Sequence, residues 1–217
     1  MFSERFSIAI QRIWLIFPWI LLDRGIYSLF RFTDSRSYPA EIPTQQFLRT
    51  KMANATSTQL QELYVAYFGR AADPTGLDYW TSKGITTAKF AADSHAALEF
   101  KSVYGSLSTE SQVNQIYKNL FDRTADTAGL TYWTQEINLG NLKLGEIATH
   151  LIWAAQNNSG SEDDKTALTN KTNAAVAYTA KVKESTSAIL AYQAESTSPW
   201  VSGSNIAEAV SYMSGID

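Results

Sequence analysis

Apolar residues recur at helical spacing in the middle of the chain, at positions i, i+3, i+4, i+7 and i+8. The first such run is Leu60, Leu63, Tyr64, Tyr67 and Phe68. The second is Val113, Ile116, Tyr117, Leu120 and Phe121. This spacing predicts two helices, each with one apolar face.

Each run follows a hydroxyl residue and a glutamine three positions apart, Thr58 with Gln61 and Thr109 with Gln112. A hydroxyl and an amide at this spacing are typical of a capping box, which starts a helix. We therefore expect the first helix to begin near Thr58 and the second near Thr109.

The two helices belong to a longer sequence motif, or phrase, that the chain contains twice, at residues 63–80 and 116–133. Equivalent positions lie 53 residues apart, and both copies hold Tyr, Phe, Arg, Ala, Asp, Gly, Leu, Tyr and Trp in the same register. A repeat at such a period indicates one supersecondary unit used twice. Asp is a favoured residue before a helix, so Asp73 and Asp126 are predicted to open a second helix in each copy.

Further helices are predicted at residues 87–100, 143–156 and 163–193, with a break at 195–199 and a short helical tail that carries Ile206 and Met213. No run alternates in the way that predicts strands. The expected fold is all-α: two helix-corner-helix repeats and a long C-terminal helix, within a domain at 52–195 that is followed by a tail or the start of another segment at 196–217.

Residues 1–51 differ from this domain in composition. They hold seven basic and four acidic residues, and a run of about ten mostly apolar residues at 13–22 follows Arg12. Three interpretations stay open: the hydrophobic h-region of a signal peptide, a membrane-surface anchor, or upstream sequence before a true start at Met52. Membrane contact is expected only if this extension is present.

Charge and composition narrow the classes of function. The residues from Met52 onward hold 11 basic and 17 acidic residues, which disfavours nucleic-acid binding. The chain has no cysteine and two histidines, His95 and His150, without a metalloprotease spacing. We identify no catalytic set and no cofactor, and we expect the protein not to be an enzyme.

The arginines give the sharpest candidate site. From Met52 onward the chain has nine lysines but two arginines, Arg70 and Arg123, at the same position of the two copies. The planar guanidinium of arginine binds a carboxylate or several carbonyls better than the ammonium of lysine does. In one interpretation each arginine caps the preceding helix or pairs with the corner aspartate. In the other, the corners present an arginine, an aspartate and a ring to an anionic or sugar ligand.

The other positions of this candidate site have the same two interpretations. They are Asp73, Gly76, Tyr79 and Trp80 in the first copy, and Asp126, Gly129, Tyr132 and Trp133 in the second. The two copies differ in the carboxylates around the corner, which favours helix caps over a calcium site. One ring of each Tyr-Trp pair is expected in the core, because consecutive helical residues point about 100 degrees apart.

The phrase Tyr-x-x-x-Phe-x-Arg-x-Ala-Asp-x-x-Gly-Leu-x-Tyr-Trp, at 64–80 and 117–133, resembles the signature of the DUF4214 family. The start at 52–56 and the stretch at 170–177 are similar to the N-terminal modules of cyanobacterial surface-layer and hemolysin-like (RTX-type) secreted proteins. The resemblance covers about residues 52–195. The chain lacks the Gly- and Asp-rich nonapeptide repeats through which the larger proteins bind calcium. A role for calcium is therefore implied only by the resemblance to these proteins.

This resemblance implies a non-catalytic structural or anchoring module of a bacterial surface-layer-like protein. The implied location is extracellular, at the outer membrane, and the implied partners are outer-membrane polysaccharide, including lipopolysaccharide, or like subunits. An alternative is an intracellular helical scaffold that resembles the linker domains of light-harvesting assemblies.

Overall fold

The structure is a computed structural model, and it describes residues 52–192 and 204–216. Within these ranges the protein is all-α. Its β-type pairing there is limited to an isolated antiparallel bridge between Asn54 and Thr86. The interpretations of residues 1–51 and the break predicted at 195–199 lie outside the described residues. No helix in the described ranges combines the length and the apolar character needed to cross a bilayer.

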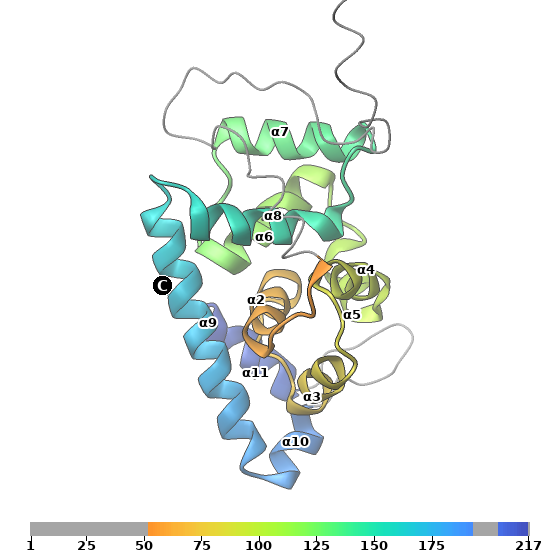
Figure 1. The fold of residues 1–217 in the computed structure, drawn as a ribbon, viewed down its shortest axis with the longest axis vertical. Coiled ribbons are helices and arrows are strands. Elements are labelled where there is room, and N and C mark those ends of the chain that lie inside the picture. Colours follow the sequence, from red (N-terminus) through yellow and green to blue (C-terminus); the bar gives the residue numbers. More distant parts are fainter. Residues whose placement is uncertain (1–51, 193–203, 217) are drawn as a thin grey trace, which may run out of the picture. The chain divides into compact units, whose positions relative to one another are not determined.

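Helix α2 (Ser57–Phe68) lies in the middle of the described helices (Figure 1), and α9 (Glu162–Lys183) runs along one side of it. It also packs against α6 (Thr109–Phe121), α8 (Leu144–Asn157) and α4 (Thr87–Ala96). Every residue from Leu60 to Phe68 is buried. The sequence predicts one apolar face for this helix, whereas neighbours enclose all of its faces, including the polar Gln61 and Glu62.

Both helix starts differ from the predicted capping boxes. Thr56 caps α2, with its hydroxyl 3.2 Å from the amide of Gln59. Ser108 caps α6. The predicted boxes were wrong because their glutamines bond elsewhere: Gln61 donates to Thr179 at 2.7 Å, and Gln112 donates to the carbonyl of Tyr104 at 2.9 Å.

Two predicted helices are each divided in the structure. The chain is extended at Ala97, so the helix expected at 87–100 becomes α4 and α5 (Leu98–Tyr104). The helix expected at 163–193 ends at Lys183, and α10 (Thr186–Tyr192) follows. The hydroxyl of Ser185 caps the start of α10 by accepting from the amide of Ala188 at 3.3 Å.

The other predicted helices are confirmed. Asp73 and Asp126 cap α3 (Pro74–Ser82) and α7 (Thr127–Asn138). The structure also holds α8 close to its predicted bounds, and α11 (Ser204–Met213) contains the residues of the predicted helical tail. Helix α3 packs on α2 and α9, whereas α7 packs on α6.

Gly69 ends α2 in the left-handed conformation, with φ 62°. A Cβ here would lie 3.1 Å from Oδ1 of Asn119, whose amide donates to the carbonyl of Ala66 at 2.9 Å. The turn after α2 therefore depends on a residue without a side chain.

We predict that Gly69→Ala lowers the free energy of unfolding by about 1 kcal/mol or more, because the left-handed strain and the Asn119 contact add. Gly140→Ala is the matched control, since Gly140 has φ 74° but no neighbour within 4 Å of a Cβ. Urea denaturation of both variants measures the difference. A loss for Gly69→Ala no larger than that for Gly140→Ala would contradict the role of the Asn119 contact.

Candidate functional site

The first corner joins α2 to α3 through residues 69–73. Its last residue, Asp73, accepts a hydrogen bond from the amide of Gly76 at 2.6 Å, and Pro74 occupies the first turn of α3. A Cβ at position 76 would lie 2.7 Å from the hydroxyl oxygen of Tyr64. It would also lie 2.8 and 2.9 Å from the carboxylate oxygens of Asp73, so a side chain at this position would displace the helix cap or the Tyr64 hydroxyl.

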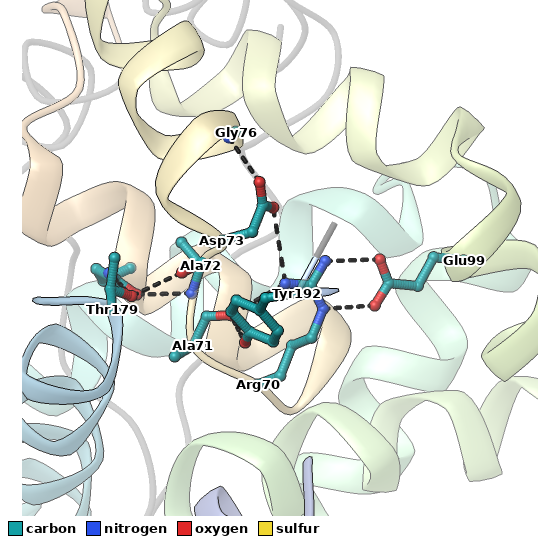
Figure 2. A network of polar contacts seen from close by, with 9 residues as sticks. Arg70, Ala71, Ala72, Asp73, Gly76, Glu99, Thr179 and Tyr192 are labelled. Atoms are coloured by element: carbon teal, nitrogen blue, oxygen red, sulfur yellow. Dashed lines mark hydrogen bonds and ion pairs between the residues drawn. The ribbon is translucent and has the colours of Figure 1, made fainter. Parts of the chain in front are cut away.

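Arg70 lies inside this corner with 2% of its surface exposed. Its guanidinium holds the carboxylate of Glu99, on α5, in a two-pronged pair, with Nε–Oε1 2.7 Å and Nη2–Oε2 2.8 Å (Figure 2). Nη1 donates to the carbonyl of Ala71 at 3.0 Å and lies 3.8 Å from Oδ2 of Asp73. Burial by itself lowers the pKa of Arg70, but the hydrogen bonds and charge of Glu99 outweigh burial and hold it above its ordinary value.

The backbone of the corner is bonded by side chains from three helices. The carbonyl of Ala71 accepts from the hydroxyl of Tyr192 at 2.5 Å, and that of Ala72 accepts from Thr179 at 2.6 Å. Gln61 of α2 accepts from the amide of Ala72 at 2.9 Å. Figure 2 shows the side chains of Thr179, from α9, and Tyr192, from α10, pointing toward the corner backbone.

Aromatic rings complete the surroundings of Arg70. The carbon of its guanidinium lies 5.3 Å from the ring centre of Tyr64 and 5.5 Å from those of Phe68 and Tyr192. A desolvated cation beside such rings gains a further favourable interaction. Burial raises the pKa of Tyr192 to about 12, so its hydroxyl stays a hydrogen-bond donor at physiological pH.

The second corner joins α6 to α7 and has corresponding contacts. Nε and Nη2 of Arg123 bind the carboxylate of Asp164 at 2.7 and 2.6 Å, and Nη1 donates to the carbonyl of Thr124 at 3.1 Å. The amide of Ala125 donates to Asn114, as that of Ala72 does to Gln61. The arginine, both backbone groups and the amide side chain stand 53 residues further along the chain than in the first corner, but the acid does not.

The two corners differ in solvent access and in the origin of the acid. The side chain of Arg123 is 40% exposed, against 2% for Arg70. Glu99 comes from α5, 29 residues after its arginine, whereas Asp164 comes from α9, 41 residues after. The backbone also differs, because Asp122, with φ 55°, stands where the first corner has Gly69.

The structure adds a partner that the sequence did not predict for either arginine. Each arginine bonds the carbonyl of the residue that follows it, and its two-pronged partner is an acid from another helix. Asp73 is a weaker neighbour of Arg70, at 3.8 Å, and acts chiefly as a helix cap. No local pattern pointed to Glu99, which stands between the exposed Leu98 and the buried Phe100 on α5.

The Tyr-Trp pairs divide between the interior and the surface. Trp133 is buried and donates from Nε1 to the hydroxyl of Tyr117 at 3.0 Å, while Trp80 is half-buried against Phe90. Tyr132 is half-buried, and Tyr79 is 51% exposed. The tryptophan is therefore the more buried ring in each pair.

The remaining candidate positions have structural surroundings. The amide of Gly129 donates to Asp126 at 2.7 Å, as Gly76 does to Asp73. His150 lies half-buried with its ring 6.0 Å from that of Trp133. Across the described residues, no three His, Asp or Glu side chains are grouped to hold a metal ion.

Fold and site together define an all-α domain whose helices are tied at two arginine-bearing corners. A DUF4214 domain lies at residues 91–161, where the chain matches the family model described as "Domain of unknown function (DUF4214)". The match takes in α5 to α8 and the second corner, and the first corner precedes it. No curated protein and no solved structure matches the chain.

We predict unequal effects of the same substitution at the two corners. Arg70→Lys should lower the free energy of unfolding by roughly 2–4 kcal/mol, because an ammonium cannot hold both oxygens of a buried carboxylate. Arg123→Lys, at an exposed pair, should cost less than about 1 kcal/mol. Urea denaturation of both variants gives the comparison.

Salt dependence provides a second measurement on these variants. Added salt should reduce the loss caused by Arg123→Lys more than the loss caused by Arg70→Lys, since exposed pairs are screened more strongly. Equal losses at both positions would show that burial of the pair does not set its contribution.

Proposed function

We propose that residues 52–195 form a non-catalytic anchoring module of a bacterial cell-surface protein, built from two helix-corner-helix units, that attaches to outer-membrane polysaccharide. The observation that carries this proposal is the internal pairing of the arginines. Arg70 and Arg123 are each joined by two hydrogen bonds to an acid of the same chain, so these charged groups serve the rigidity of the fold.

The duplicated unit supports a scaffold role. In both units a glutamine or asparagine of the first helix holds the corner amide, and an aspartate caps the second helix. The same set of contacts made twice gives helices fixed relative to each other, which is what an attachment module needs if it is to present a defined surface.

The outward residues of α3 provide the contact surface of this proposal. Tyr79 is 51% exposed, and the ammonium of Lys83 lies 5.5 Å from its ring centre. One position earlier, Asp78 pairs with Lys183 at 2.8 Å, and both side chains are more than half exposed. An exposed ring beside hydrogen-bonding groups can stack on the apolar face of a sugar while the polar groups bond its hydroxyls.

We expect the full chain to be retained by immobilised lipopolysaccharide and by cells stripped of their surface layer. Tyr79→Ala should lower retention at least several-fold, because it removes the stacking ring. Tyr212→Ala is the matched control, since Tyr212 is 44% exposed on α11, and it should bind like the unchanged protein.

Absence of retention of the unchanged protein, above that of an unrelated acidic protein of similar size, would contradict attachment to polysaccharide. Cell fractionation tests the location independently: a cytoplasmic pool bound to pigment proteins would favour the intracellular scaffold instead.

A further inference from the structure

Glu62 is a buried acid in the central helix. It is 7% exposed and lies within the stretch of α2 that is enclosed on all faces. Its Oε1 accepts a hydrogen bond from Nε2 of Gln156, in the last turn of α8, at 2.9 Å. Gln61, the residue beside it, is bonded to Thr179 and Ala72 instead.

The charged side chains that neighbouring helices turn inward are engaged elsewhere. On the side of α3 and α4, Asp73 caps α3 and Asp93 pairs with Lys89. On α5, Glu99 holds Arg70.

The charged groups of α8 also have other partners: Glu146 accepts from the amide of Lys143, and His150 lies beside Trp133. On α9, Asp164 holds Arg123, and Lys171 donates to the carbonyl of Lys118. In α6, the charged residues Glu110 and Lys118 are exposed.

Among the side chains that the structure describes, no cation therefore pairs with Glu62. A carboxylate in such surroundings loses its hydration without an ion to replace it, so burial favours the neutral acid. A neutral group is also what the second unit holds at the same register, where Gln115 donates to Asn119 at 2.8 Å.

We propose that Glu62 is a proton-controlled latch between α2 and the C-terminal turn of α8. With the proton bound, the neutral acid and Gln156 hold the end of α8 against α2. When the proton leaves, the hydrogen bond from Gln156 becomes stronger, but the buried charge draws in water, and this hydration loosens the packing of α8 on α2. The chain from α8 leads directly to the start of α9, so the same event loosens the segment that carries Asp164.

The pH range of the latch follows from the surroundings of the acid. Burial, opposed by the hydrogen bond from Gln156, raises the pKa of Glu62 from 4.5 to about 7. Between these values the folded chain keeps a proton that the unfolded chain releases. The free energy of unfolding therefore falls as pH rises through this range, and above about pH 7 this contribution no longer changes.

Chemical denaturation of the full chain between pH 4.5 and 8.5 tests the latch against Glu62→Gln, which places the amide of the second unit at this position. Relative to the variant, the unchanged protein should become less stable as pH rises, by on the order of a hundredfold in its unfolding equilibrium constant. Glu184→Gln, at an exposed acid, is the matched control and should follow the unchanged protein.

Two measurements on the folded protein show which helices respond to the deprotonation of Glu62. Hydrogen exchange, corrected for intrinsic rates, should show protection lost at high pH at the end of α8 and the start of α9 in the unchanged protein but kept in Glu62→Gln. Carbon-13 NMR should show the Glu62 carboxyl titrating well above its ordinary range, a measurement that needs no variant.

Three results would overturn the proposal. They are a Glu62 carboxyl that titrates at its ordinary value, the same pH dependence in the unchanged protein and Glu62→Gln, and protection lost equally in all helices.

Discussion

A guanidinium with 2% of its surface exposed requires an anion inside the protein, and Glu99 meets that requirement for Arg70. The pair ties α5 to the end of α2, and the corner around it also receives side chains from α9 and α10. An unpaired charge at this depth would cost several kcal/mol. The helices that meet here are therefore held in one arrangement, and the ring contacts of Tyr64, Phe68 and Tyr192 complete it.

The second corner shows that the local contacts do not depend on this depth. Arg123 makes the same two-pronged pair and the same bond to the next carbonyl, although 40% of its side chain is exposed. The two corners differ in the helices whose side chains reach them. Thr179 and Tyr192 bond the first corner, and α9 reaches the second through Asp164 near its start. One long helix thus serves both corners from its two ends, which makes α9 the element that unites the described domain.

These contacts use the arginines, the helix-capping aspartates and the glycines after them in the construction of the fold. The DUF4214 match at 91–161 includes the second corner and therefore a complete set of arginine, helix-capping aspartate, glycine and buried tryptophan. The proposed attachment surface lies instead on outward side chains such as Tyr79, which surround that framework. This separation between a rigid, internally paired frame and an exposed contact face is common to domains whose function is binding.

The sequence by itself determined the all-α class and the helices opened by Asp73 and Asp126, because caps and helical periodicity act within a few residues. It predicted the starts of α2 and α6 to within a residue but not their caps, Thr56 and Ser108, since Gln61 and Gln112 bond groups outside their own helices. It did not predict the end of α9 at Lys183, beyond which Tyr192 turns back to the carbonyl of Ala71. Glu99 and Asp164 became the partners of the arginines through packing between helices, at two unrelated spacings along the chain. Only the tertiary structure decided these pairings and the burial of Glu62, because both depend on which helices enclose α2, and no local pattern in the chain specifies that.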